Sequence, residues 1–363
     1  MGKKKKRIFL SISFRVIATF FCILLLLSYV SVLIDPAVFP PAGFFGIYFI
    51  PVLIINILLF FTALFRWSSS VWIPVIAIAP SLLFAGSFLK IPVKSIPETE
   101  RNGSIKILTY NVGGFRSGTG NPETNLRNVI ALLEDENPQI VSMQEFRTSD
   151  TSSISKLFHD YPYIRKHFYR LRNGDFVGNV TLSRLPITED GFLRFRGTTN
   201  MALYTDIDYG HDAFRLYNIH LESNNISLTS MIKELKGGYD EFSQEFTEIH
   251  EKVRKSSTKR GSQVRALLDN IPESGLPAVI CGDVNDTPMS YCFRNLSKGR
   301  KDTFREAGSG FGATYRILWP LLRIDYVFVP ESVRVSGHRT PRVRYSDHYP
   351  VIADIDITDS LNL

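Results

Sequence analysis

Hydrophobic and polar positions divide the 363-residue chain into two parts. Three apolar stretches, at 16–34, 44–65 and 71–89, lie in the first ninety residues and contain almost no charge. A transmembrane helix needs about 20 such residues, because the hydrocarbon core is about 30 Å thick and a helix rises about 1.5 Å per residue. The pattern therefore predicts an all-α membrane anchor over 1–90 with about three transmembrane helices. Pro74 and Pro80 lie in the third stretch, where neighbouring helices can satisfy the carbonyls that proline frees.

The charges beside these stretches predict an orientation. Four lysines and an arginine fill positions 3–7, and such clusters stay on the cytoplasmic side of a membrane. Three crossings place the rest of the chain outside the cytoplasm, whereas two would leave it inside. A cleaved signal peptide is the alternative for the first stretch, but this stretch is long and lacks a small-residue cleavage site before Asp35. We expect an integral membrane protein with a cytoplasmic N-terminus and an extracytoplasmic larger part.

The remainder of the chain has the pattern of a water-soluble domain. Residues 91–102 contain Pro92, Pro97 and several polar residues, which is typical of a linker. From 103 to 363, short apolar runs alternate with polar segments, and 125–137 and 260–270 have the periodicity of amphipathic helices. The strand-like runs are 105–110, 140–143, 179–183, 202–206, 214–220, 278–281, 324–329 and 351–355. Many strands with few helices predict a layered α/β or α+β fold.

Charge and cysteine content narrow the possible partners. Nine of the 42 Lys and Arg residues and one of the 35 Asp and Glu residues lie at or before Lys94, which leaves 33 basic and 34 acidic residues and a net charge of −1 beyond it. A nuclease of duplex DNA normally presents a basic groove, so this balance disfavours one. Cys22, Cys281 and Cys292 do not form a disulfide framework or a thiolate metal site, although a bridge between the last two stays open in an oxidising compartment.

Polar residues at the ends of apolar strands are the candidates for chemistry, because a strand holds a side chain rigidly and its end opens to solvent. They are Asn111, Glu145, His220, Asp283, Asn285, Asp325, Asp347 and His348. Carboxylate and amide oxygens are the ligands that Mg²⁺ and Mn²⁺ prefer. A carboxylate can also orient or deprotonate water, and histidines can hold phosphoryl oxygens. This set predicts metal-dependent hydrolysis of a phosphate ester without a covalent nucleophile.

Six short strings, read in order, resemble the magnesium-dependent endonuclease/exonuclease/phosphatase superfamily. They are YNV (110–112), QE (144–145), NIHLE (218–222), GDVNDTP (282–288), RIDYVF (323–328) and SDHYPV (346–351), and GNVTLSRLPI (178–187) is similar to the middle segment of the family. The resemblance covers essentially all of the chain after the linker. It implies a four-layer sandwich of two β-sheets flanked by helices over 103–363, with the active site at one end of the sheets.

The resemblance also implies a metal site. Glu145 matches the main ligand of Mg²⁺ or Mn²⁺, Asn111 matches a further ligand, and Asp347 matches a second-metal or water-linked ligand.

The remaining candidates match groups that act on water or on phosphate. Asp283 matches the carboxylate that activates the attacking water, and Asn285 the amide that positions it. His348, oriented by Asp325, matches the group that hydrogen-bonds the scissile phosphate. His220 matches a histidine that stabilises phosphate or serves as an acid in the deoxyribonuclease and sphingomyelinase branches. The sequence leaves open whether Asp283 or a histidine is the general base. It also leaves open whether Arg184 contacts phosphate or forms a structural ion pair.

These observations predict a membrane-anchored phosphodiesterase or phosphatase whose partners are the bilayer and a phosphoester, with no obligate protein partner. Anchoring favours a lipid headgroup or a small phosphoester as the substrate. A membrane-tethered nuclease and a catalytically inactive binding module with the same fold are the alternatives. The polar segment 223–259 is either a solvated helical insertion or a contact for phosphate or lipid headgroups.

Overall fold

The computed structural model describes residues 3–91, 103–210, 212–224 and 239–357, and it divides into two compact units. The first comprises Met1–Gly86, Asn224–Gly261 and Thr287–Arg294, and the second comprises Ser87–Ser223, Ser262–Asp286 and Asn295–Leu363. All eight candidate residues belong to the second unit. Of the predicted linker, only Ile91 lies within the described residues.

The first unit contains two long apolar helices, α1 (Lys3–Ser31) and α2 (Ala42–Phe65). Ser11–Ser31 has a mean hydropathy of 2.1 and α2 one of 2.5, and both are long enough to cross a membrane. Only 22% of each apolar window is buried, whereas the core helix of a soluble protein is mostly buried. Their apolar side chains therefore face the surroundings.

The third apolar stretch does not form a continuous helix of spanning length in the described residues. It consists of η1 (Ser69–Val71), α3 (Trp72–Ile78), η2 (Ala79–Leu83) and η3 (Ala85–Ser87). Helix α3 gives way to the tighter η2 at Ala79, beside Pro80, which has no N–H to donate to a helix. Three transmembrane helices therefore stay a prediction.

The segment predicted as a helical insertion forms, from Tyr239 onward, part of the long helix α7 (Tyr239–Asn270), whereas residues 225–238 lie outside the described part of the chain. The first unit includes α7 up to Gly261. There the ring of His250 lies beside Tyr48 of α2, whose Oη is 3.0 Å from His250 Nε2.

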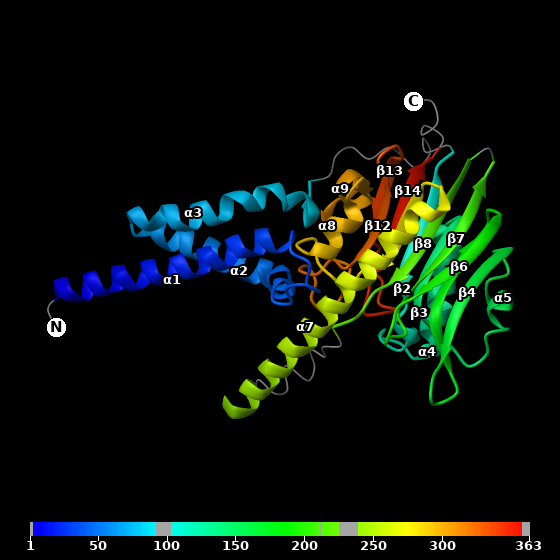
Figure 1. The fold of residues 1–363 in the computed structure, drawn as a ribbon, viewed down its shortest axis with the longest axis horizontal. Helices are drawn as coiled ribbons and strands as arrows, with labels where there is room; N and C mark the ends of the chain where they lie inside the picture. The colour runs from blue at the N-terminus through cyan, green and yellow to red at the C-terminus, as the bar shows by residue number, and fades with distance from the viewer. Residues whose placement is uncertain (1–2, 92–102, 211, 225–238, 358–363) are drawn as a thin grey trace. The chain divides into compact units, whose positions relative to one another are not determined.

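Two six-stranded mixed sheets form the centre of the second unit (Figure 1). The first has the order β13 (Arg334–Arg339), β14 (Val351–Asp356), β2 (Ile105–Asn111), β3 (Ile140–Thr148), β5 (Phe176–Ser183), β4 (Tyr163–Arg170). The second has the order β10 (Arg300–Asp302), β12 (Asp325–Pro330), β9 (Ala278–Asp283), β8 (Asp212–His220), β7 (Met201–Tyr209), β6 (Ile187–Arg194). A short pair joins β1 (Leu89–Lys90) to β11 (Gly310–Phe311).

The inner faces of the two sheets share one apolar core. Ile107 of β2, Phe214 of β8 and Val327 of β12 are fully buried members of it. The outer face of the first sheet packs against α4 (Pro122–Glu136) and α5 (Ile154–Leu157). The end of α7 from Ser262, η6 (Ile271–Ser274) and α9 (Thr303–Ala307) belong to the same unit, and α9 packs against β10 and β12 of the second sheet. Helix α8 (Tyr291–Ser297) begins in the first unit and ends in the second. The predicted class, two sheets flanked by helices, is confirmed.

Buried amides fix the two sheets against each other. Gln144 Nε2 of β3 donates to Asn218 Oδ1 of β8 at 2.8 Å, and Asn179 Nδ2 of β5 donates to the Asn218 carbonyl at 2.9 Å. Asn218 Nδ2 returns a hydrogen bond of 3.0 Å to the carbonyl of Val180. Because a buried amide without partners costs about 1–3 kcal/mol, these bonds strongly favour one alignment of the sheets.

All eight predicted strand-like runs overlap observed strands, but the four edge strands of the two sheets, β4, β6, β10 and β13, were not predicted. In β6 the side chains of Glu189 and Asp190 are exposed, and β4 has no buried position. A strand whose two faces are both partly solvated lacks the apolar alternation that identifies strands from sequence.

Gly282→Ala tests how closely β8 and β9 approach each other. Gly282 has a φ of 133°, and a Cβ there would overlap the carbonyl oxygen of Ile219. We expect the free energy of unfolding of the full chain to fall by about 3 kcal/mol or more, measured by urea denaturation. Gly275→Ala is the control, since Gly275 has a φ of 64° but open space around it, and it should cost about 1 kcal/mol. Equal losses in the two variants would contradict the steric argument.

Candidate active site

Strand register brings three candidates side by side across the second sheet. His220 of β8 pairs with Asp283 of the parallel strand β9, and Asp283 pairs with Asp325 of the antiparallel strand β12. In the first sheet, β2 and β3 run parallel, and Asn111 pairs with Gln144, the neighbour of Glu145. The ends of β2, β8 and β9 and the start of β12 therefore supply the site, as the strand-end argument predicts, whereas Glu145 lies inside β3, which continues to Thr148.

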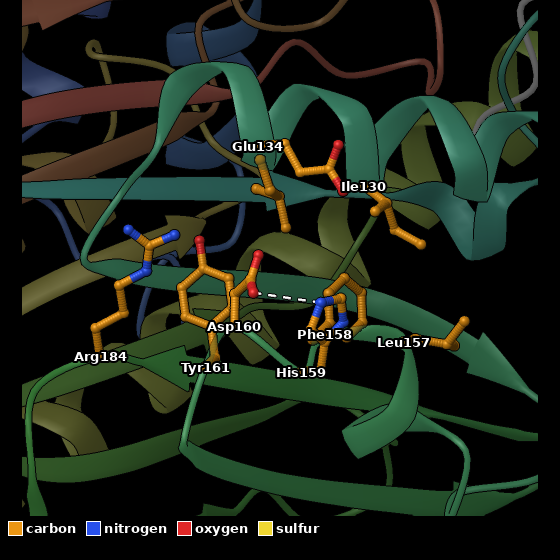
Figure 2. A pocket seen from close by; sticks show the side chains of 9 residues that line it. Ile130, Glu134, Leu157, Phe158, His159, Asp160, Tyr161 and Arg184 are labelled. Carbon is orange, nitrogen blue, oxygen red and sulfur yellow. Dashed lines mark ion pairs between the residues drawn. The ribbon is translucent and has the colours of Figure 1, made fainter.

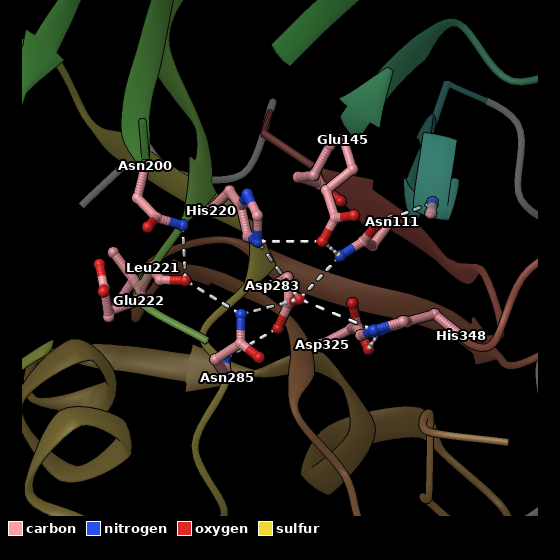
Figure 3. Close-up of polar contacts among 12 residues, drawn as sticks. Asn111, Glu145, Asn200, His220, Leu221, Glu222, Asp283, Asn285, Asp325 and His348 are labelled. Carbon is pink, nitrogen blue, oxygen red and sulfur yellow. Dashed lines mark hydrogen bonds and ion pairs between the residues drawn. The ribbon is translucent and has the colours of Figure 1, made fainter. Parts of the chain in front are cut away.

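Asp283 is the centre of the cluster (Figure 3), and its side chain is fully buried. Its Oδ2 accepts hydrogen bonds from Asn111 Nδ2 at 2.9 Å and from Asn285 Nδ2 at 3.1 Å. Its Oδ1 accepts from the Asn285 N–H at 2.8 Å. Asn285 holds this position with a φ of 55°, a left-handed conformation that asparagine tolerates better than most residues.

Glu145 lies beside Asp283 at an irregularity of β3. The register of β3 and β5 shifts between Met143 and Phe146, and Glu145 has a φ of 50°. A bulge of this kind turns a side chain away from the regular alternation of a strand. Glu145 Oε1 accepts from Asn111 Nδ2 at 3.1 Å and lies 3.4 Å from His220 Nε2, while 40% of its side chain remains exposed. Glu145 is thus the carboxylate of the cluster that reaches solvent.

His220 presents an unsatisfied nitrogen to the cluster. Its Nε2 is buried, has no hydrogen-bond partner, and lies 3.9 Å from Asp283 Oδ2 (Figure 3). A buried polar atom without a partner is uncommon, and it marks a place where a further group can bind.

His348 and Asp325 form a hydrogen-bonded pair on the other side of Asp283. His348 Nδ1 lies 2.9 Å from Asp325 Oδ2, and its Nε2 lies 3.8 Å from Asp283 Oδ2. Thr314 supports the pair, because its Oγ1 accepts from the N–H of Asp325 at 3.0 Å. The geometry agrees with the predicted role of Asp325 in orienting the imidazole.

Asp347 is joined to the cluster through Ser346. Ser346 Oγ, fully buried, lies 2.8 Å from the carbonyl of Asn111 and 3.1 Å from Asp347 Oδ1. The Asp347 N–H donates to Ser117 Oγ at 3.2 Å. The sequence pattern indicates no role for Ser346 or Ser117. A small hydroxyl residue carries no distinctive pattern, and only the neighbouring Asp347 and His348 point to this segment.

Burial and charge change the acid–base properties of the cluster. Burial, together with the charge of Asp325, raises the pKa of Asp283. Burial alone would lower the pKa of His348, but Asp325 and Asp283 outweigh it and raise that pKa to about 10. An imidazolium between two carboxylates is therefore the stable state at neutral pH.

In the described part of the chain, one group of three side chains has the spacing of a divalent-cation site. One ligand atom from each of Asp283, Asp325 and His348 lies within 4.8 Å of the others. His348 already hydrogen-bonds Asp325 there and supplies the positive charge that the two carboxylates require. Of the predicted ligands, Glu145 contacts Asn111 directly, and Asp347 is joined to Asn111 through Ser346. Their oxygen atoms, and the solvent-reaching carboxylate of Glu145, are of the kind that suits Mg²⁺ or Mn²⁺. Ligation by Asn111 Oδ1 would require its amide to turn, since Oδ1 accepts from the Gly113 N–H at 3.0 Å.

A pocket elsewhere in the second unit contains none of the candidate residues (Figure 2). It is lined by Ile130, Leu133, Glu134, Leu157, Phe158, His159, Asp160, Tyr161 and Arg184. Arg184 lies over the Tyr161 ring, 5.1 Å from its centroid, and donates to Asn137 Oδ1. These contacts favour the structural role of Arg184 over phosphate binding. His159 and Asp160 form a solvent-exposed pair of 3.3 Å that carries little energy.

Comparison with protein families identifies both parts of the chain. A model described as the Endonuclease/Exonuclease/phosphatase family matches residues 108–348, which is more than half of the chain. A model described as a domain of unknown function (DUF8431) matches residues 6–88. No curated protein matches the chain at a significant level.

Solved structures share the fold at low sequence identity. The endonuclease/exonuclease/phosphatase from Beutenbergia cavernae is 18% identical with a TM-score of 0.52, and the match covers 70% of this chain and 72% of that one. Humanized D. rerio TDP2 is 18% identical with a TM-score of 0.51 and 70% and 100% coverage. The human Nocturnin catalytic domain is 15% identical with a TM-score of 0.51 and 70% and 94% coverage. At these identities the likeness shows the fold alone.

The raised pKa of His348 predicts a pH-dependent contribution to stability. An unfolded histidine titrates near pH ~6.5, so the stability from protonated His348 is fully present below that pH and is lost as the pH rises toward about 10. We expect His348→Gln to lower the free energy of unfolding by about 3 kcal/mol near pH ~6.5, because two buried carboxylates lose their cation. The loss should shrink as the pH approaches about 10.

Urea denaturation of the full chain over a range of pH measures this difference. The control is His338→Gln, since burial lowers the pKa of His338 to about 3. Its folded form is neutral, so its contribution is present above pH ~6.5 and falls as the pH drops below that value. A deficit in His348→Gln that stays constant from neutral to alkaline pH would refute the imidazolium.

Proposed function

The chain belongs to the endonuclease/exonuclease/phosphatase family, whose members are generally phosphoester hydrolases, and we propose that it hydrolyses a phosphate ester with a divalent metal ion. The observation that carries the proposal is the buried carboxylate of Asp283 between two histidines, with His220 Nε2 at 3.9 Å and His348 Nε2 at 3.8 Å. Both ring nitrogens face the carboxylate that would activate water. A tetrahedral anion has the charge and the acceptor oxygens that suit such donors.

Asp283 is the proposed base. A carboxylate with a raised pKa accepts a proton from water near neutral pH more readily than an ordinary carboxylate does. The amides of Asn285 and Asn111 hold its oxygens at 2.8–3.1 Å. Since the side chain cannot rotate without breaking these bonds, the attacking water would meet it in one orientation.

His348 and His220 are the proposed phosphate-binding groups. The Nε2–H of a protonated His348 is directed away from Asp325 and can donate to a phosphoryl oxygen. The unsatisfied Nε2 of His220 can do the same, or can protonate the leaving oxygen. The solved structure of the human Nocturnin catalytic domain, which has the same fold, contains a bound sulfate anion. That anion supports a tetrahedral oxyanion as the ligand class.

Glu145, Asn111 and Asp347 are the residues proposed to hold Mg²⁺ or Mn²⁺. When bound, the ion would offset the negative charge that builds on the phosphoryl oxygens. Burial, followed by the charges of Asp347, Asp283 and Glu145, raises the pKa of Tyr315 to about 12. Three carboxylates therefore lie close enough to affect the pKa of one phenol, and such a concentration of negative charge favours the binding of a cation.

The first unit is proposed to anchor the domain in a membrane. Helices α1 and α2 have the length and hydropathy of spans, and exposed side chains such as Val16 and Leu58 would otherwise meet water. With the basic residues at 3–7 in the cytoplasm and three crossings, the catalytic domain would be extracytoplasmic.

Asp283→Asn should abolish most turnover while the chain stays folded. Asparagine keeps the shape of the side chain but cannot accept the proton, so kcat should fall by about 10³-fold or more. The assay follows hydrolysis of bis(4-nitrophenyl) phosphate with Mg²⁺, Mn²⁺ or a chelator. Asp206→Asn is the control, because Asp206 is a buried carboxylate that pairs with Arg215 at 2.5 Å outside the site. Wild-type turnover in Asp283→Asn would remove the assigned mechanism.

Protease protection tests the topology. A cleavable tag after Leu363 should be digested in intact cells from outside if the catalytic domain is extracytoplasmic, because three crossings place it there. A tag before Lys3 should be digested only after lysis. Protection of the C-terminal tag would instead indicate two crossings and a cytoplasmic domain.

A further inference from the structure

Exposed large apolar side chains are concentrated at one place in the second unit. Among its described residues they are Leu89 (48% exposed), Ile91 (81%), Phe192 (41%), Phe311 (44%), Ile317 (50%) and Trp319 (39%). Phe192 stacks on His167 with their rings 3.5 Å apart. The other five belong to two segments, 89–91 and 311–319, and we call them the apolar rim.

The two segments of the rim lie together. Leu89 pairs with Phe311 in the β1–β11 ladder, and the Gly312 N–H donates to the Phe88 carbonyl at 3.1 Å. The Phe311 and Trp319 rings contact each other edge to face, with centroids 6.0 Å apart. The rim is therefore a continuous apolar surface, and such surfaces mark interaction sites.

The position of the rim, next to the proposed membrane anchor in the chain, indicates which surface it contacts. β1 begins at Leu89, the last residue of the apolar stretch 71–89 of the proposed anchor, and Leu89 pairs with Phe311. Arg342 lies over Trp319, with its guanidinium carbon 4.2 Å from the ring centroid. Tryptophan beside a basic side chain is the combination found at the boundary between lipid and water.

A basic pocket adjoins the rim. It has a volume of about 240 Å³ and is lined by Phe311, Arg339, Thr340 and Arg342 among other residues. Glu136 pairs with Arg339. A pocket of this size with a guanidinium at an apolar edge suits an anionic headgroup.

The rim and the active site share one loop. Residues 315–322 are closed at their base, where the N–H groups of Thr314 and Tyr315 donate to the Leu322 carbonyl at 2.9 and 3.1 Å. Tyr315 bridges to His348, and the Arg316 N–H donates to the Asp347 carbonyl at 2.7 Å. Ile317 and Trp319 follow within four residues of these contacts.

We propose that the apolar rim contacts the surface of an anionic bilayer and thereby presents the active site to the headgroup phosphoesters of membrane lipids. The inference rests on the membrane anchoring proposed above, and it names the substrate class of the proposed hydrolase.

Tryptophan fluorescence tests the contact in the full chain, because Trp67, Trp72 and Trp319 are its only three tryptophans. Trp67→Phe with Trp72→Phe leaves Trp319 as the reporter. The variant is reconstituted in vesicles of phosphatidylcholine and phosphatidylglycerol, in which the phosphatidylcholine carries bromine on its acyl chains. Both leaflets contain the quencher, so the orientation of the protein does not affect the result. We expect strong quenching of Trp319, and less after Ile317→Asp removes an apolar contact.

The matched control places the single reporter tryptophan outside the rim. Trp319→Phe with Phe192→Trp, in the same background, places the tryptophan at an exposed aromatic position outside the rim, where bromine should quench little. If bromine quenches Trp319 no more strongly than the control tryptophan, the rim does not contact the bilayer and the proposal is overturned. This holds whether water or another part of the protein covers the rim.

Two hydrolysis assays on the same samples separate this inference from the proposed function. Ile317→Asp should lower kcat/KM for phosphatidylglycerol in the vesicle on the order of tenfold and leave that for soluble bis(4-nitrophenyl) phosphate within about twofold. An equal change in kcat/KM for both substrates in Ile317→Asp would refute lipid headgroups as the substrate class. So would a wild-type chain that hydrolyses the soluble ester but not the lipid. If the wild-type chain hydrolyses neither substrate while Trp319 is strongly quenched, the hydrolase is refuted and the bilayer contact stands.

Discussion

The burial of the Asp283 carboxylate is the constraint on which the rest of the site depends. A carboxylate removed from water is stable only with donors or positive charge around it. Asn111 and Asn285 supply the donors, and His348 supplies the charge, which Asp325 in turn supports. Each of these residues therefore has a role in folding as well as a proposed role in catalysis. Removal of one leaves the others without compensation, so their effects should not be additive.

That carboxylate lies where it does because β2 of the first sheet and β8 and β9 of the second end close together, so that Asn111 reaches Asp283. The pairing of β2 with β3 and of β8 with β9 fixes each pair internally, but only contacts between the sheets fix one pair against the other. The buried amide of Asn218 supplies such contacts, since it bonds to both Gln144 and Val180 of the opposite sheet. An apolar core alone allows small sliding movements, whereas directional hydrogen bonds penalise them. The sandwich thus positions the site through a few buried polar side chains.

Sequence patterns predicted the central strands and the fold class, because those strands are apolar and end in polar residues. They also predicted which residues cluster: Asp283, Asn111, Asn285, His220, Glu145, Asp325 and His348 all lie within one network. The predicted roles in metal binding and catalysis stay predictions. The partners that hold the cluster were not predictable, because the hydroxyls of Ser346 and Thr314 bond to backbone groups of segments that are distant in the sequence. The bulge at Glu145 was equally hidden, since a register shift of one residue leaves no mark in composition.

The loop from Tyr315 to Leu322 connects the two proposals, because its first residues are hydrogen-bonded to the site and its later residues belong to the apolar rim. Its base is held by Thr314, which also supports Asp325, and its first residues contact Asp347 and His348. Force applied at Ile317 or Trp319 is therefore transmitted to a segment that cannot shift without breaking hydrogen bonds of the site. If the rim rests on a bilayer, the distance between the headgroup plane and Asp283 is set by this loop and not by the linker after Ile91. A loop that holds Asp283 at one distance from the headgroup plane selects the phosphoesters that lie at that depth in the bilayer. This restricts the choice of substrate more strongly than tethering to the membrane alone.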